Sequence, residues 1–243
     1  METNQIIILV IGCVCAYLIA GVNPAIIFSK LLHKQDIREC GSGNPGFTNY
    51  KRTFGGIDAW MVFILDLAKT IVPVLVFSLV LKHMSGEVII KQFSAQLIGL
   101  CAMIGHAYPV WYKFKGGKAF TTSMAVIYIV DWRVALVSTV IFLTLLLTIK
   151  FMSLASISTA IASPIGLTVV GIINGFSTLY IVTIILSALA GALLIFRHKS
   201  NIARLLAGKE SRFYLFKRKK KKETPPAPAD QTSEQPSEQT TNQ

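Results

Sequence analysis

Long apolar runs alternate with short polar segments along most of this 243-residue chain. A helix that spans a bilayer needs about 20 predominantly apolar residues, and most of the runs reach that length. The runs, in order, are Ile6–Phe28, Ile57–Leu81, Phe93–Trp111, Ala119–Val130, Val134–Ile149, Leu154–Ile173 and Phe176–Phe196. The pattern predicts an all-α, polytopic membrane protein with about seven transmembrane helices.

The fourth run, Ala119–Val130, has only twelve residues. We therefore expect a short or tilted helix that begins inside a lysine-rich loop. Asp131 and Arg133 separate it from the fifth run. If this run did not span, the later loops would change sides of the membrane.

Composition supports the membrane interpretation. Hydrophobic residues make up 53% of the chain and charged residues only 15%, against about 25% charged residues in soluble domains. The formal net charge is +12, which in a soluble protein would raise the question of nucleic acid. Here the basic residues cluster between apolar runs, so membrane topology explains them and we expect no nucleic-acid partner.

The basic residues also predict an orientation. Of 24 Lys and Arg residues, twenty lie in the tail or in loops on one side, three lie on the other side (Lys82, Lys91 and Arg133), and Lys69 lies within the second run. Cytoplasmic loops carry the excess of Lys and Arg. We therefore expect a multi-pass protein of the cell membrane, with the N-terminus outside and the C-terminus and motif loops in the cytoplasm.

The chain divides into a membrane-embedded domain, 1–212, and a tail, 213–243. Lys217–Lys222 is a run of six basic residues, either a stop-transfer anchor or a binding segment for anionic lipid. Apart from its prolines, Glu223–Gln243 contains no apolar residue larger than alanine, so we expect a disordered polar tail.

The residue types argue against several kinds of chemistry. The four cysteines, Cys13, Cys15, Cys40 and Cys101, do not have the spacing of a zinc site. No Ser–His–Asp or Cys–His arrangement is visible in the sequence. We therefore expect free, buried thiols, no metal and no cofactor.

The first polar loop, Gly41–Arg52, is rich in Gly, Ser, Asn and Thr and ends in two basic residues. Small residues allow the backbone to approach a ligand closely, and the hydroxyl, amide and cationic groups can donate to phosphate oxygens. An ordinary polar turn between two helices is the alternative.

The second loop contains Lys115-Gly116-Gly117-Lys118, two cations around two flexible residues. We expect Lys118 to open the next helix, whose free N–H groups favour an anion. The segment is not a Walker P-loop, because Tyr112 and Ala119 stand where that motif needs Gly and Ser or Thr. His106, near the end of the third run, is either a structural hydrogen-bonding group or part of this site.

The third segment, Arg197–Arg212, can form a short amphipathic helix that lies in the membrane interface and brings His198, Asn201 and Arg204 near the other loops. A plain juxtamembrane basic helix is the alternative. Asp66 and Lys69, inside the second run, are expected to pair and support the site, because isolated charges at membrane depth are unfavourable. Together, the three segments predict a site for a phosphate-bearing substrate beside an apolar one.

At these residues the chain resembles the bacterial acyl-phosphate:glycerol-3-phosphate acyltransferase family (PlsY type). That family carries a Ser-Gly-Asn-x-Gly-Ala-Thr-Asn loop, a Gly-His-x-x-Pro…Lys-Phe-Lys-Gly-Gly-Lys-Gly segment and a C-terminal Asn-Ile…Arg…Gly-x-Glu segment. Ser42–Asn49, Gly105–Lys118 and Asn201–Glu210 match them in order and spacing. The resemblance extends from Ile6 to about Arg212.

The resemblance implies transfer of a fatty acyl group from a long-chain acyl phosphate to the 1-hydroxyl of glycerol 3-phosphate. The products are lysophosphatidic acid and phosphate, and the reaction is the first step of phospholipid synthesis. An acyl phosphate has a good leaving group, so the enzyme mainly needs positioning and charge stabilisation. The sequence leaves the oligomeric state open, a monomer included.

The resemblance also implies roles for residues. Ser42, Arg52 and Lys118 are expected to hold phosphate groups, His106 and His198 to orient the acceptor hydroxyl, and His198 to act as base unless a substrate phosphate oxygen does. The full set of expected substrate-binding residues is Ser42, Gly43, Asn44, Gly46, Thr48, Asn49, Arg52, Lys115, Gly116, Gly117, Lys118, Asn201, Arg204 and Glu210.

The chain departs from the family pattern in two places. Phe47 replaces the usual Ala, and Ala119-Phe120-Thr121 replaces the usual Gly-Val-Ala. Both changes place bulk beside the phosphate loops and leave substrate preference open. A transporter for a phosphorylated metabolite or lipid is an alternative function, although the glycine-rich and basic elements lie on one side only. A lipid-binding scaffold is another, but it does not explain the glycine-rich loops.

Overall fold

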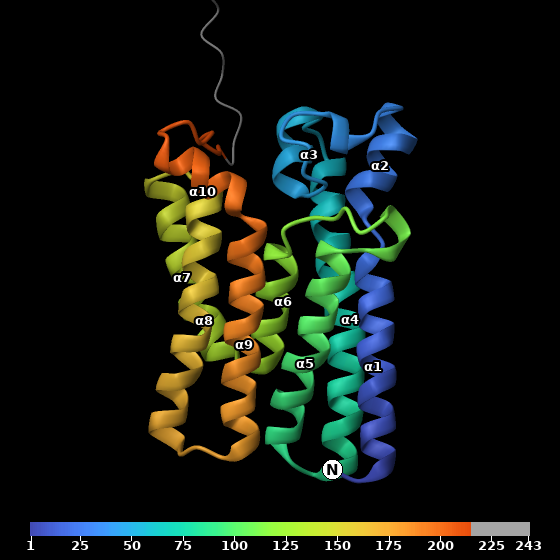
Figure 1. Ribbon diagram of the computed structural model, residues 1–243, viewed down its shortest axis with the longest axis vertical. Helices are drawn as coiled ribbons and strands as arrows, with labels where there is room; N and C mark the ends of the chain where they lie inside the picture. Colours follow the sequence, from blue (N-terminus) through green and yellow to red (C-terminus); the bar gives the residue numbers. More distant parts are fainter. Residues whose placement is uncertain (215–243) are drawn as a thin grey trace, which may run out of the picture. The chain divides into compact units, whose positions relative to one another are not determined.

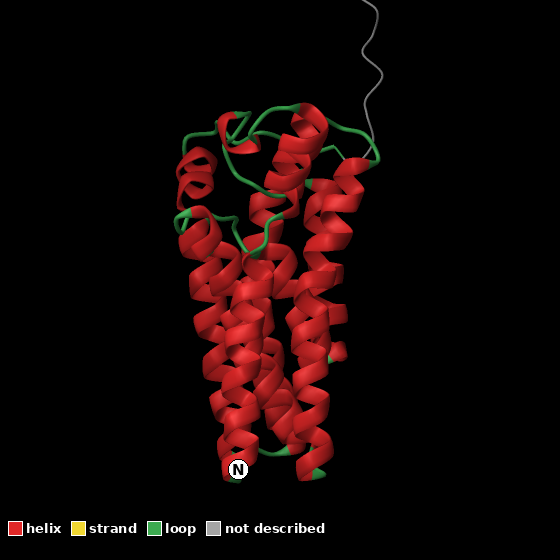
Figure 2. Ribbon diagram, turned by 90° about the vertical axis from the view of Figure 1, so that its right-hand side faces the viewer, coloured by secondary structure: helices red, strands yellow, loops and turns green. Residues whose placement is uncertain are grey.

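The computed structural model describes residues 1–214. The basic run Lys217–Lys222 and the polar tail predicted to be disordered lie outside the described residues. Met1–Phe213 forms one compact unit, traced in Figure 1. Its regular elements are all helical (Figure 2).

Seven apolar helices make up the bundle in the described part. They are α1 (Thr3–Gly21), α4 (Asp58–Ser85), α5 (Val88–Ala107), α6 (Phe120–Val130), α7 (Trp132–Thr148), α8 (Met152–Asn174) and α9 (Thr178–Arg197). Five spans are long and apolar enough to cross a membrane, and α6 and α7 are shorter apolar helices. The predicted all-α membrane fold is confirmed.

The first apolar run is two helices rather than one. We expected a continuous run from Ile6 to Phe28, but α1 ends at Gly21 and α2 (Pro24–His33) begins a new helix. The residue before a proline is driven out of the α region, and Asn23 is extended at φ −110° and ψ 105°. Its side-chain oxygen accepts a hydrogen bond from the Ile26 N–H at 3.1 Å and so caps α2.

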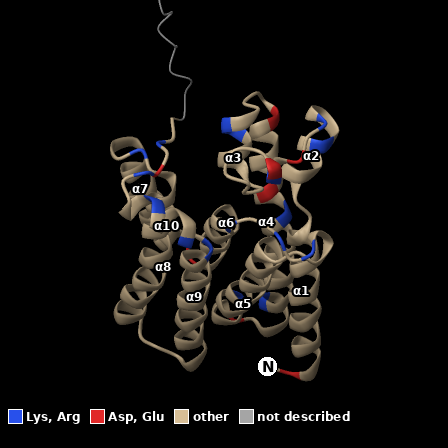
Figure 3. Cartoon of the chain, turned by 45° about the horizontal axis from the view of Figure 1, so that its top comes forward, with Lys and Arg blue, Asp and Glu red and all other residues tan. Residues whose placement is uncertain are grey.

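Short elements surround one end of the bundle, which we call the motif end. They are α2, η1 (Ile37–Glu39), α3 (Phe47–Thr53), η2 (Val110–Tyr112) and α10 (Lys199–Leu206). The N-terminus lies at the opposite end in Figure 1. Most of the Lys and Arg residues in the described part gather at the motif end (Figure 3).

Helices α6 and α7 form a hairpin that is shorter than its neighbours. Asp131 joins the two helices, and its carboxylate accepts a hydrogen bond from the Arg133 N–H at 3.0 Å. Asp131 therefore caps the N-terminus of α7. The predicted break between the fourth and fifth runs is confirmed at Asp131, whereas Arg133 lies inside α7. Helix α6 is only 11 residues long.

The outer faces of the bundle are apolar. Small residues such as Ala16, Ala95 and Ala102 are fully buried at the centre, which lets α1 and α5 approach closely. By contrast, Val10 on α1 and Ile172 on α8 are exposed on the surface of the bundle. Exposed apolar faces of this extent are unfavourable in water and suit contact with lipid chains.

The charges predicted to pair inside the second run do so. Lys69 Nζ lies 2.9 Å from Asp66 Oδ1, and it also donates to the Val22 carbonyl at 2.7 Å. That carbonyl belongs to the end of α1, where the break at Pro24 removes the helical partners. The pair therefore holds α4 against the joint between α1 and α2.

Candidate active site

A cleft of about 260 Å³ opens at the motif end of the bundle. The first loop forms one wall, the end of α9 and the start of α10 form the other, and the second loop contributes the residues between them. The lining residues are Ser42, Gly43, Asn44, Pro45, Gly116, Lys118, Phe196, Arg197, Lys199, Ser200 and Arg204. The structure thus brings together the three segments that the sequence singled out.

Asn49 organises the first loop. Its side-chain oxygen accepts a hydrogen bond from the Ser42 N–H at 2.9 Å, and its amide nitrogen donates to the Cys40 carbonyl at 2.9 Å. Asn49 is 97% buried, with 3% of its surface exposed, so it shapes the loop from beneath rather than facing the cleft. Gly41, at φ +55°, supplies the left-handed turn above it.

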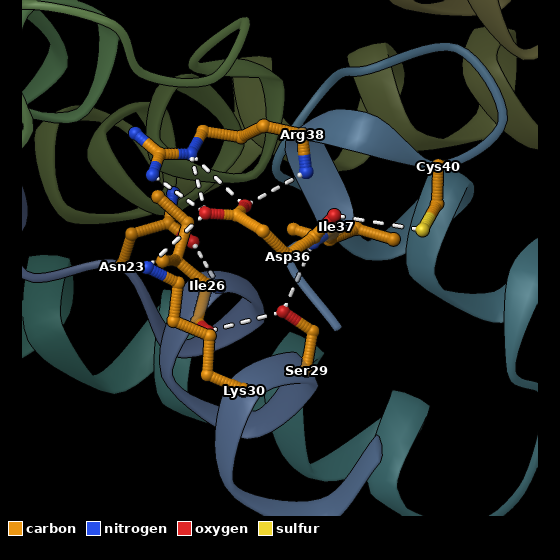
Figure 4. Close-up of polar contacts among 8 residues, drawn as sticks. All are labelled: Asn23, Ile26, Ser29, Lys30, Asp36, Ile37, Arg38 and Cys40. Atoms are coloured by element: carbon orange, nitrogen blue, oxygen red, sulfur yellow. Dashed lines mark hydrogen bonds and ion pairs between the residues drawn. The ribbon is translucent and has the colours of Figure 1, made fainter. Parts of the chain in front are cut away.

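Polar contacts link α2 to the segment that leads into the first loop (Figure 4). Asn23 donates to the Pro45 carbonyl at 3.0 Å, so the same side chain caps α2 and holds the loop. Asp36 receives a short bond from Arg38, at 2.6 Å, and an ion pair from Lys30, at 3.2 Å. The Asn23 contact ties the first loop to the start of α2, and the Asp36 contacts hold the segment before the loop.

The two glycines of the second loop pack tightly instead of providing flexibility. The Gly116 N–H donates to the Ala107 carbonyl at 3.2 Å and the Gly117 N–H to the His106 carbonyl at 3.0 Å. Arg197 holds the same pair, because its guanidinium donates to the Gly117 and Gly116 carbonyls at 3.0 and 2.9 Å. Their backbone groups are therefore engaged within the protein, and a phosphate at this wall meets side chains.

Lys118 does not open a helix as we expected. The next helix, α6, begins at Phe120, after Ala119 in the left-handed region at φ 59°, so the predicted helix-terminal anion site is wrong in its position. The Lys118 ammonium instead donates to the Asn201 side chain. Burial, together with the nearby positive charge of Arg204, lowers the pKa of Lys118 to about 8.

His198 lies where α9 ends and α10 begins, and 4% of its surface is exposed. Its Nδ1 is 2.8 Å from the Leu194 carbonyl, which assigns the proton to Nδ1 and leaves Nε2 as an acceptor. Burial, with the charge of Lys118 nearby, lowers the pKa of His198 to about 4. The ring is therefore neutral at physiological pH.

Glu210 ties the third segment together. It accepts hydrogen bonds from Asn201 at 2.7 Å, Ser153 at 2.8 Å and Arg204 at 2.7 Å. Burial alone would raise the pKa of Glu210, but these bonds outweigh it and hold the pKa below its usual value. Asn201 is thereby fixed between Glu210 and Lys118, and Arg204 is fixed at the cleft wall.

Other predicted site residues lie outside the cleft wall. Arg52, at the end of α3, donates to the Ser211 carbonyl at 3.0 Å. Lys115 is exposed, and Thr48 is half-buried in the first turn of α3. His106 lies beneath Gly117, where an added Cβ would meet its ring, and its Nδ1 is 3.8 Å from Asp66 Oδ1.

Sequence reasoning missed several lining residues, above all Arg197, Lys199 and Ser200. Their position in the sequence could have indicated them, because all three lie within two residues of His198 in the third segment. Their place on the wall depends on how α9 ends against the second loop, which no local pattern records. Within residues 1–214, no group of His, Cys, Asp and Glu side chains is arranged to hold a metal ion.

A family model described as glycerol-3-phosphate acyltransferase matches residues 10–208 of the chain. A glycerol-3-phosphate acyltransferase of Thermoanaerobacter sp. (strain X514) is 36% identical over 203 residues, covering 84% of this chain and 94% of the relative. One from Staphylococcus aureus (strain Newman) is 37% identical over 203 residues, covering 83% of this chain and 96% of the relative.

The fold is similar to that of PlsY (YgiH), described as an integral membrane glycerol 3-phosphate acyltransferase. Its crystal structure in the glycerol 3-phosphate form gives a TM-score of 0.72 at 33% identity, covering 85% of this chain and 96% of that one. The lysophosphatidic acid form gives a TM-score of 0.69 at 33% identity, covering 85% and 95%.

Proposed function

This chain belongs to the glycerol-3-phosphate acyltransferase family, and we propose that it transfers a fatty acyl group from an acyl phosphate to the 1-hydroxyl of glycerol 3-phosphate. The hydroxyl oxygen forms an ester bond with the acyl carbon, and the bond between that carbon and the phosphate oxygen breaks. The hydroxyl proton passes to a base or to the departing phosphate. The products are lysophosphatidic acid and inorganic phosphate.

The cleft that joins the three motif segments carries this proposal. It presents the cations Lys118, Arg197, Lys199 and Arg204 at the end of an apolar bundle. Both substrates bear a phosphate group, and one also bears a long apolar chain. Charged donors in a partly buried cleft stabilise phosphate strongly, while the apolar helix faces suit the acyl chain.

We assign His198 and Lys118 different tasks in the reaction. A neutral imidazole with Nε2 as acceptor suits orientation of the acceptor hydroxyl, and it can take the proton if no substrate oxygen does. Lys118, in its charged form, suits the negative charge that develops as phosphate leaves. Ser42 and Asn44 on the facing wall supply neutral donors to the same cleft.

We also propose that the motif end faces the cytoplasm and that the protein resides in the cell membrane. The concentration of basic residues at this end supports that orientation. Membrane lipid is then its immediate surroundings, and lysophosphatidic acid leaves the cleft directly into the inner leaflet.

The donor distinguishes this function from other acyl transfers. Purified full-length protein in detergent is supplied with radiolabelled glycerol 3-phosphate and either palmitoyl phosphate or palmitoyl-CoA. We expect labelled lysophosphatidic acid and stoichiometric phosphate with the acyl phosphate, and no product with the thioester, because the cleft offers phosphate ligands and the sequence shows no adenine-nucleotide site.

A reaction without glycerol 3-phosphate measures hydrolysis of the donor and is subtracted. Equal rates with both donors would refute the proposed donor. Absence of labelled lipid with either donor, from protein that remains monodisperse in detergent, would refute the acyl transfer itself.

A further inference from the structure

A short segment follows Glu210, the last motif residue that matches the family pattern. The family model ends at residue 208, yet the structure describes an ordered path from Glu210 to Phe213. Ser211 and Arg212 are exposed, whereas Phe213 retains only 3% of its surface. A buried aromatic ring at the end of an exposed segment indicates that the segment is held in place.

One side of the cleft anchors this segment. Glu210 at its start is bonded to Ser153, Asn201 and Arg204, as described above. At its end, the Phe213 N–H donates to the Lys150 carbonyl at 2.7 Å. The segment is therefore attached to α10 and to the junction of α7 and α8.

Its other contacts are with α3, next to the first loop. Arg52 Nη2 donates to the Ser211 carbonyl at 3.0 Å and lies 3.4 Å from the Arg212 carbonyl. The Arg52 guanidinium carbon is 5.8 Å from the centre of the Phe213 ring. The Phe213 ring is in turn 6.3 Å from that of Phe47.

These contacts join two sides of the cleft. Helix α3 packs against α2 and α4, whereas α10 packs against α9. Phe47 is also the residue that stands where the family motif has alanine, so the aromatic partner of Phe213 is a feature of this chain. The departure from the motif thus has a structural counterpart beyond the family match.

We propose that Ser211–Phe213 is a strap that positions Arg52 for phosphate binding. The strap carbonyls accept from one terminal nitrogen of the guanidinium, and the guanidinium lies over the Phe213 ring. The remaining N–H groups of the fork can then meet a substrate phosphate in a fixed orientation. This inference rests on the proposed function and on the phosphate-binding role that the family resemblance implies for Arg52, which lies beside the cleft wall and not among its lining residues.

A double-mutant cycle tests the strap. Phe213→Ala is expected to raise the KM of at least one substrate about tenfold, which is about 1.4 kcal/mol, with a small change in kcat. Arg52→Ala should raise the same KM further. In the Arg52→Ala background, Phe213→Ala should have no additional effect, because the residue through which it acts is gone.

Truncation provides a second variant. Ending the chain after Glu210 should reproduce the Phe213→Ala phenotype, whereas ending it after Tyr214 should leave both kinetic constants within about twofold. Phe213→Leu should largely restore KM, because an apolar side chain still fills the site. Phe176→Ala, at the opposite end of the bundle, is the matched phenylalanine control and should leave KM unchanged.

The possible failures are distinguishable. If Phe213→Ala and Arg52→Ala have additive effects on KM, the strap acts on stability alone and the inference is wrong. An unchanged KM in both Phe213→Ala and the chain truncated after Glu210 also overturns the inference. If Arg52→Ala has normal kinetics, the proposed phosphate role of Arg52 fails first, and the strap inference falls with it.

Discussion

Lys118 is the cation on which the three motif segments converge. It comes from the second loop, bonds Asn201 of the third segment, and lines the cleft opposite Ser42. Asn201 supplies an acceptor but no countercharge, and the nearest carboxylate, Glu210, is already engaged by Arg204. An unneutralised ammonium in a partly buried cleft is suited to a phosphate, which restores the balance of charge.

We expect Lys118→Ala to reduce acyl transfer at least about 30-fold, because loss of a charge-assisted phosphate contact from a desolvated site removes about 2–4 kcal/mol. The pH dependence follows from the same group. With a pKa of about 8, Lys118 is charged below that pH, so kcat/KM should fall as pH rises through about 8. Lys118→Arg should move this alkaline limb upward, since guanidinium stays charged.

Lys34→Ala is the control for this prediction, because Lys34 lies at the same end of the bundle and outside the cleft wall. It should retain wild-type kinetics. Similar small losses for both alanine variants would mean that these lysines serve topology alone. An alkaline limb that does not move in Lys118→Arg would assign that limb to another group.

The sequence predicted which residues form the site more successfully than it predicted their contacts. Ser42, Asn44, Lys118 and Arg204 do line one cleft, because polar residues between apolar runs have few other places to go. The sequence did not predict that Arg197 holds the glycine pair. That contact depends on where α9 stops relative to a loop about 80 residues earlier, and no spacing rule encodes such a relation.

Contact with the C-terminal end of α5 determines the conformation of the second loop. Gly116 and Gly117 hydrogen-bond to the last carbonyls of that helix, which are among the orphan acceptors of a helix C-terminus. The same contact leaves no room for a side chain at Gly117. The loop is therefore shaped by close approach and not by flexible hinge residues.

Gly117→Ala should accordingly lower both stability and activity. A Cβ at this position overlaps the His106 ring, and overpacking of this kind destabilises by about 1–3 kcal/mol. We expect a lower apparent Tm in detergent and a reduced rate of acyl transfer. The measurements are a thermal unfolding scan of the purified protein and the labelled-lipid assay.

Removal of the His106 ring tests whether steric overlap causes the loss of stability in Gly117→Ala. In the double variant Gly117→Ala with His106→Ala, the Tm should recover toward that of His106→Ala alone. If the double variant is instead destabilised by the sum of the two single effects, steric overlap with His106 is not the cause. An unchanged Tm in Gly117→Ala would contradict the prediction directly.

The helices themselves were largely predictable, because their apolar runs are long and their ends carry charges or glycines. The division of the first run was missed for a physical reason. Apolar residues continue on both sides of Asn23 and Pro24, so hydropathy shows no boundary, although the proline does. The break has a role, since it exposes the Val22 carbonyl to Lys69 and frees Asn23 to hold the first loop.

For the whole molecule, orientation in the membrane is the property that the charge pattern predicts and that labelling measures. Single cysteines at Ser85 and Lys34, in a background without native cysteines, lie at opposite ends of the bundle. A membrane-impermeant maleimide added to intact cells should label Ser85→Cys, and label Lys34→Cys only after permeabilisation. The reason is the excess of Lys and Arg at the motif end.

Labelling of Lys34→Cys but not of Ser85→Cys in intact cells would reverse the proposed orientation. Labelling of both positions in permeabilised cells is the required control for reactivity. Equal labelling of both sites in intact cells would indicate leaky cells, which a cytoplasmic marker protein with an exposed cysteine reports independently.

The hairpin of α6 and α7 has a consequence for the surrounding lipid. At about 1.5 Å per residue, the 11 residues of α6 rise about 16 Å and the 17 residues of α7 about 25 Å, both less than a hydrocarbon thickness of about 30 Å. Arg133 at the turn still keeps about half of its side chain exposed, 51%. The bilayer must therefore become thinner beside this hairpin or admit water to the guanidinium. We therefore expect the activity of this enzyme to depend on the thickness of the bilayer around the hairpin.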